Sequence, residues 1–411
     1  MPRRRRSEVI REDEVGVYHV WVRCVRRAWL CGLDPLTGND YEHRKGWIES
    51  RLAELARIFA LDACVDAVLS NHYHRLLRNR PDLVLQWSDE EVARRWWQLC
   101  PQRCNEDGSP ADPSPFELRC MTSDAKRIAK WRGRLSSISW LLQYLNQWLA
   151  KRANKEDDVT GHFIEGRFEC RSLLDEGAVL AASVYIDLNE MRARLADTPE
   201  ASRHTSIGCR ILARVAREGL ALEQGLAAPE IAPDCEPEPE KTHEADDWLC
   251  PINEQDCAPL LGPAPVESVA TSQALFRMTA SSPVETCEPA GSALLTQVDA
   301  SPSGPAVNRG AARKAWRHGF LGMTEDEYLN FLDWNARQVI PGKSGAMDSS
   351  LPPILERMGM APAFWLRMIE NYDRWFRTAV GTAEHLAAEA VRTGRRWLHG
   401  IGPLRAASTS G

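Results

Sequence analysis

The first regular pattern along the chain is an alternation of apolar and polar residues over positions 17–24. Tyr18 and Val20 would share one face of a strand, and His19 and Arg23 the other, because successive side chains of a strand point to opposite faces. The alternation predicts a strand with one apolar and one polar face.

Further elements follow along the first half of the chain. Apolar residues within 48–59 recur at spacings of four, three and four, as on one face of a helix. Residues 62–69 and 72–77 are β-like runs separated by a short turn, and 138–149 again shows helical periodicity. The polar segment of about 79–123 is interrupted by prolines and is interpreted as an insertion.

The last elements of this region are a short strand within 163–174 and a helix from about Asp175 to Leu195, with Asp175 as its N-cap. The order β-α-β-β-α-β-α is typical of an α+β fold with a ferredoxin-like split βαβ sheet and its helices on one side. We therefore expect one domain over residues 12–215.

Only helices are predicted near the C-terminus. Thr324 and Glu327 have the spacing of a capping box. Apolar residues within 365–376 form one helical stripe, and core packing is the simplest interpretation of it. We expect a small all-α accessory domain over 311–400.

Composition separates these two regions. Residues 219–309 are aperiodic and rich in Pro, Ala and Ser. Within them, 219–290 hold 14 acidic and 2 basic residues, and the whole chain has a formal net charge of −6. Such a segment buries too little apolar surface to offset the entropy of ordering, so we predict a disordered acidic linker. Because the acidity belongs to the linker, it does not exclude nucleic-acid binding elsewhere.

Location and nucleotide use are also constrained by the sequence. The arginine-rich N-terminus turns polar without an apolar stretch typical of a signal peptide, and nowhere do eighteen apolar residues run together. We expect a cytoplasmic protein without a membrane partner. No complete phosphate-binding P-loop is present, so no nucleotide cofactor is expected.

His72 and His74 are candidate metal ligands. Residues two apart on a strand project from one face, so both imidazoles can reach one cation. Taken alone, two nearby histidines are more often incidental than ligands.

Tyr185 and Asn189 form a second candidate pair. Positions four apart share a face of a helix, and Ala178, Ala181 and Ala182 on that face are small enough to let the helix lie close to a sheet. Taken alone, a half-buried tyrosine and a surface asparagine are the simpler interpretation.

Arginines recur beside every candidate element, which suggests a phosphate-binding surface. The candidate DNA-binding residues are Arg23, Arg26, Arg27, Arg75, Arg167, Arg171 and Arg192.

Together these segments resemble the HUH single-tyrosine transposases. Residues 70–77 are similar to the histidine-hydrophobic-histidine motif of that family, and 185–193 to its tyrosine helix. Residues 18–23 and 165–168 resemble further motifs of the REP-associated tyrosine transposase branch. The resemblance spans about residues 15–210, with the motifs in the family's order.

The resemblance implies an enzyme that cleaves and rejoins single-stranded DNA with imperfect hairpins, using Mg²⁺ or Mn²⁺. It implies that His72, His74 and Asn189 are metal ligands and that Tyr185 is the nucleophile. Attack by Tyr185 would leave a 5′-phosphotyrosine and a free 3′-OH, so that rejoining needs no ATP. Arg75 stands where the family usually has an aliphatic residue, and Glu190 where it commonly has proline.

Other functions share parts of this pattern. A relaxase or replication initiator uses the same motif, although a tyrosine on a helix about 110 residues after the histidines favours a transposase. A domesticated DNA-binding protein without cleavage activity, or chance motifs in a helical scaffold, would also account for single elements. Because every candidate catalytic residue precedes residue 194, we expect a chain ending near Arg217 to carry the chemistry alone. The C-terminal helices are compatible with DNA contact, a homodimer or a host partner.

Overall fold

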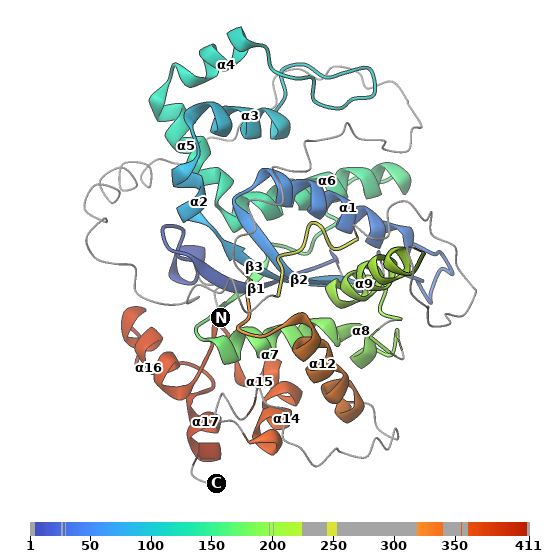
Figure 1. The fold of residues 1–411 in the computed structure, drawn as a ribbon, viewed down its shortest axis with the longest axis vertical. Coiled ribbons are helices and arrows are strands. Elements are labelled where there is room, and N and C mark those ends of the chain that lie inside the picture. The colour runs from blue at the N-terminus through green and yellow to red at the C-terminus, as the bar shows by residue number, and fades with distance from the viewer. Residues whose placement is uncertain are drawn as a thin grey trace.

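The protein was analysed as a computed structural model, which describes residues 5–25, 28, 30–196, 198–199, 201–223, 245–252, 319–339, 355 and 361–408. The fold is α+β, and its centre is a five-stranded mixed sheet in the order β2-β3-β1-β4-β5 (Figure 1).

The predicted strands and the predicted hairpin are present in this sheet. The strands are β1 (Gly16–Arg23), β2 (Leu61–Val68), β3 (His72–Asn79), β4 (Glu169–Leu173) and β5 (Ala379–Val380). Strand β1 pairs antiparallel with both β3 and β4, and β2 pairs antiparallel with β3. Strand β3 therefore lies between β1 and β2, which are connected through a helix. Strand β5 joins the edge of β4 in parallel.

Helices cover both faces of the sheet, which corrects the expectation of helices on one side (Figure 1). Helices α1 (His43–Ile58) and α6 (Ile138–Glu156) pack on one face, and α7 (Glu176–Asp187) packs on the other. The reason lies in the strands, because both of their faces carry apolar residues. Tyr18 belongs to the core on the α1 side, whereas neighbouring Val17 belongs to the core on the α7 side.

The polar insertion and the residues directly after it form four helices: α2 (Pro81–Gln86), α3 (Asp89–Leu99), α4 (Pro115–Thr122) and α5 (Ala125–Leu135). Pro81 and Pro115 each begin a helix, a position that tolerates proline because its missing N–H would have no helical partner. Trp97 and Trp131 are buried in the core that continues to the α1 face of the sheet. The prolines therefore start helices here and do not break them.

The C-terminal elements pack onto the α7 face of the sheet. The helices are α12 (Glu325–Val339), α14 (Pro362–Glu370), α15 (Tyr372–Trp375), α16 (Ala383–Arg392) and α17 (Ile401–Ser408). The predicted capping box is present, since the Glu327 N–H donates to Thr324 Oγ1 and the Thr324 N–H donates to Glu327 Oε2. Trp365 and Tyr372 are fully buried in the same core as α7. Because this region also supplies β5, it is not a separate all-helical unit.

Part of the predicted linker is ordered. Helix α9 (Ser206–Glu223) extends into it, and residues 245–252 pack at the β2 edge, where Leu249 bridges Ala63. Trp248 and Leu249 are buried there, so this short apolar stretch differs from its acidic surroundings. The rest of the predicted linker, 224–244 and 253–309, lies outside the described residues.

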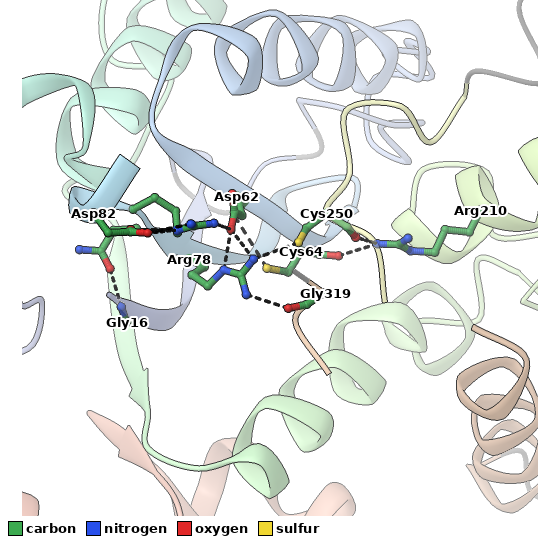
Figure 2. A network of polar contacts seen from close by, with 10 residues as sticks. Gly16, Asp62, Cys64, Arg78, Asp82, Arg210, Cys250 and Gly319 are labelled. Carbon is green, nitrogen blue, oxygen red and sulfur yellow. Dashed lines mark hydrogen bonds and ion pairs between the residues drawn. The ribbon is translucent and has the colours of Figure 1, made fainter. Parts of the chain in front are cut away.

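A buried polar network ties these distant segments to the sheet (Figure 2). Asp62 accepts a hydrogen bond from Arg78, whose guanidinium also donates to the Gly319 carbonyl at 2.9 Å. Arg210 donates to the Cys250 carbonyl at 2.7 Å. The network gives the buried Arg78 charge its partner and fixes segments far apart in the sequence around one strand edge. No described helix is long and apolar enough to cross a lipid bilayer.

Candidate active site

Strands β1 and β3 bring the predicted histidines together with a third one. The register pairs Trp21 with His74 and Arg23 with His72, so His19, Trp21, His72 and His74 lie on the α7 face of the sheet. The rings of His72 and His74 are 5.0 Å apart between centroids, and those of His19 and His74 are 5.1 Å apart. Strand alternation and the register between β1 and β3 together produce this cluster.

Hydrogen bonds engage the same nitrogen of both predicted ligands. His72 Nδ1 lies 2.6 Å from Asn71 Oδ1, and His74 Nδ1 lies 2.9 Å from His19 Nε2. An Nδ1–H that donates leaves the Nε2 lone pair of the same ring as a potential ligand. Metal-binding histidines commonly have this arrangement, in which a neighbouring acceptor fixes the tautomer.

Burial keeps these imidazoles neutral. Burial, followed by the charge of Arg23, lowers the pKa of His72 to about 4. Burial and the neighbouring His19 and His72 hold the pKa of His74 well below its usual range. Neutral imidazole is the form that binds metal, so both side chains are in the right state at neutral pH.

Helix α7 places Tyr185 against this cluster. The predicted cap is present, because Asp175 Oδ1 accepts a hydrogen bond from the Ala178 N–H. Ala178 and Ala181 are buried, and the helix lies close to the sheet. The Tyr185 ring is 5.7 Å from that of His74, edge to face. The histidines and the tyrosine, which are far apart in the sequence, therefore lie next to each other in the fold.

Two residues that the sequence did not single out for chemistry complete the site. Tyr372, on α15, stacks on Tyr185 with ring centroids 4.7 Å apart and an interplanar angle of 23°. The Tyr185 hydroxyl donates to Asp373 Oδ2 at 2.5 Å, and Asp373 Oδ1 lies 2.8 Å from an Arg171 nitrogen. Tyr372 was predicted only as core, and nothing in the local sequence around Asp373 indicates a contact across 188 residues. His19 is different, since the alternation of β1 already put it on the polar face.

Asn189 lies just beyond a break in the predicted helix. Helix α7 ends at Asp187, and the short α8 (Asn189–Arg192) begins after Leu188. Asn189 is 8% exposed, and its Nδ2 has no hydrogen-bond partner among the described residues. A half turn of the amide exchanges N and O, so the unpartnered position can equally present an oxygen to a cation.

The side chains of His72, His74 and Asn189 are chemically suited to bind a metal ion. Two neutral imidazoles and one unpartnered amide suit a divalent cation and leave coordination positions for phosphate oxygens and water. Within the described part of the chain, no three or more His, Cys, Asp or Glu side chains are grouped to hold a metal.

Six of the seven predicted DNA-binding arginines fall into three groups. Arg23 and Arg167 are exposed. Arg171 and Arg192 flank Tyr185, since the Arg192 guanidinium lies 5.2 Å from its ring centre and Arg171 shares Asp373 with it. Buried N–H groups of both have no partner among the described residues. Arg26 and Arg27 lie outside the described residues.

Arg75 lies on the opposite face of β3 from the histidines. It is fully buried, its Nε lies 2.5 Å from Asp66 Oδ1, and its guanidinium stacks over Tyr73. Its position is explained by the partner carboxylate on the neighbouring strand, and its side chain does not reach the surface. Glu190 is also buried, 3.8 Å from Lys45.

Comparison with known proteins adds no relative. No protein-family model, no curated protein and no solved structure matches the chain.

Proposed function

We propose that this protein is a metal-dependent single-tyrosine DNA transposase of the HUH type. It would nick and rejoin single-stranded, hairpin-forming DNA through a 5′-phosphotyrosine. One observation carries the proposal: two histidines on β3 and a tyrosine about 110 residues later meet on one face of the sheet, with the His74 and Tyr185 rings 5.7 Å apart.

The strand order supports the same family of folds. In the part β2-β3-β1-β4, a helix joins β1 to β2 while β3 lies between them, and every neighbouring pair is antiparallel. We infer a ferredoxin-like split βαβ core, extended by β5.

The donor set supports metal-assisted phosphoryl transfer. Mg²⁺ or Mn²⁺ held by His72, His74 and Asn189 would polarise the scissile phosphate and neutralise the charge that develops in the transition state. The histidines need no deprotonation first, because burial already keeps them neutral.

The remaining roles belong to side chains around Tyr185. The Tyr185 oxygen attacks phosphorus and becomes the bridging atom of the adduct. Arg171 and Arg192 hold unpartnered N–H groups beside it, suited to bind phosphate oxygens and orient them. Tyr372 and His74 contact the Tyr185 ring from two sides, which limits its rotation before the attack.

The test is covalent capture of DNA. Incubated with Mn²⁺ and hairpin-forming single strands from the DNA flanking its gene, the full-length protein is expected to form an adduct that survives denaturing electrophoresis. Tyr185→Phe should abolish the adduct and retain DNA binding, since only a hydroxyl is lost. Tyr41→Phe, a tyrosine outside the site, is the matched control.

Two results would contradict the proposal. An undiminished adduct in Tyr185→Phe would remove Tyr185 as the nucleophile. Adduct formation that persists in excess EDTA would remove the metal from the mechanism.

A further inference from the structure

Asp373 is in direct contact with the candidate nucleophile. Helix α15 places its Oδ2 2.5 Å from the Tyr185 hydroxyl, across 188 residues of sequence. Among the described residues, no other hydrogen bond to this hydroxyl is present. A carboxylate with one oxygen on a nucleophilic O–H has the geometry required of a general base.

We propose that Asp373 is the general base of strand cleavage and the general acid of strand rejoining, an inference that rests on the proposed function of Tyr185. The carboxylate accepts the phenolic proton as the Tyr185 oxygen bonds to phosphorus. It returns that proton when the same oxygen leaves during rejoining.

Arg171 prepares Asp373 for this role. Burial works against the charged form, but Arg171 at 2.8 Å and the Tyr185 hydrogen bond together hold the pKa of Asp373 below its usual range. The carboxylate is therefore ionised and ready to accept a proton. Its side chain is 56% exposed, so the accepted proton can exchange with water. The Arg171 charge also offsets repulsion between Asp373 and an incoming phosphate.

Tyr185 needs such a partner. The pKa of a tyrosine hydroxyl is ordinarily about 10, so the hydroxyl is neutral at physiological pH. A neutral phenol has to lose its proton while it attacks. A base already hydrogen-bonded to it removes the need for a rare phenolate, an effect typically worth about 10²–10⁴ in rate.

The O–H bond of Tyr185 breaks toward Asp373 Oδ2, its oxygen bonds to phosphorus, and the bond from phosphorus to the 3′ oxygen breaks. In an in-line displacement the leaving oxygen lies opposite Tyr185, out of reach of Asp373, and takes its proton from water. In rejoining, the 3′-OH attacks phosphorus and gives its proton to water, while protonated Asp373 donates to the departing Tyr185 oxygen.

The same hydrogen bond could instead hold Tyr185 in an inactive position. Loss of the Asp373 carboxylate would slow adduct formation if Asp373 is a general base, and would speed it if the contact is inhibitory. The test measures single-turnover adduct formation by full-length Asp373→Asn at saturating hairpin DNA and Mn²⁺. Asparagine keeps the shape and an oxygen acceptor but is a far weaker base. The rate is expected to fall about 100-fold or more, with hairpin and Mn²⁺ affinities unchanged. Asp333→Asn, an exposed residue of α12 paired with Arg337, removes a charge of the same kind and should leave the rate unchanged.

An Asp373→Asn variant that forms the adduct at the wild-type rate or faster would overturn the inference. Asp373→Ala with added formate provides a second measurement, because a small carboxylate entering the vacated space should restore part of the rate. Folded Asp373→Ala that formate does not accelerate would count equally against a base. Failure of the proposed function is distinguishable, since the wild-type protein would then form no Tyr185-dependent adduct.

Discussion

The two faces of one sheet serve different purposes in this protein. Toward α1 and α6, strands β1 and β3 present Tyr18, Val20 and Leu77, all buried in an apolar core. Toward α7 and α15, the same strands present His19 and His74, also buried but hydrogen-bonded to each other. Neighbouring residues of one strand therefore have different roles, since one packs in the apolar core and the next belongs to the candidate site.

Burial has a different effect on each face of the sheet. On the apolar face, burial removes hydrocarbon from water and stabilises the fold. On the polar face, burial by the C-terminal helices changes the protonation of the site, since it lowers the pKa of His72 and His74 and raises that of Tyr185. The C-terminal region thus acts on the site in two ways, by covering it and by supplying Asp373.

The largest expected effect comes from removing that cover. A chain ending at Arg217 loses β5, Asp373 and the C-terminal residues, among them Trp365 and Tyr372, that share one apolar core with α7. We expect loss of cooperative urea unfolding and of near-UV circular dichroism, together with dye binding to exposed apolar surface. This revises the expectation that the N-terminal region suffices. A truncated protein that unfolds cooperatively and forms the adduct would restore it.

Arg75 and Arg167 allow a buried arginine to be compared with an exposed one by substitution. Arg75→Leu leaves Asp66 buried without its partner, and we expect a loss of about 3–5 kcal/mol of unfolding free energy, measured with urea. Asp66→Asn in the same chain should recover part of it. The folded fraction should bind DNA as before.

Arg167→Gln should have the opposite signature, because Arg167 is exposed. Stability should change little, while hairpin affinity falls and the salt dependence of binding loses a slope of about one unit. Two results would show that the two arginines have been assigned to the wrong roles. One is weaker DNA binding by folded Arg75→Leu, and the other is unchanged DNA binding by Arg167→Gln.

The smallest effect concerns pH. Burial, with a contribution from Arg171, holds the pKa of His19 well below its usual value in the fold. A depressed folded-state pKa contributes stability above the unfolded value near 6.5, and this stability is lost as the pH falls below it. The loss is up to roughly 1.4 kcal/mol per pH unit for each such group.

Urea midpoints between pH 7.5 and 5.5 measure this loss. His19→Gln should flatten the decline, whereas His399→Gln, at an exposed position, should not. An equal decline of stability with falling pH in the wild-type protein and in His19→Gln would show that folding does not lower the pKa of His19.

Local patterns predicted much of the fold. Alternation identified β1, and a β-like run after a short turn identified β3, and with it the shared face of His72 and His74. The Asp175 cap and the Thr324 capping box were also predicted and are confirmed, because caps depend on residues within one helical turn.

Long-range pairing was not predictable in the same way. Strand β5 has two residues, too few for any periodicity, and it is defined only by its partner β4. Arg75 appeared to be one more basic residue beside the histidines until Asp66 on the adjacent strand explained it. The contact of Asp373 with Tyr185 likewise depends on the whole C-terminal packing and on no local signal.

The pairing of β4 with β5 also imposes an order in time. It joins residues 172–173 to 379–380, so a very large loop must close before the sheet has its fifth strand. At ribosomal speeds of about 5–20 residues per second, Asp373 emerges roughly 10–40 s after Tyr185. During that interval the nascent chain already exposes its histidines and tyrosine but lacks the acceptor for the phenolic proton. Synthesis itself would therefore delay any reactivity toward DNA until the chain has folded back on its own sheet.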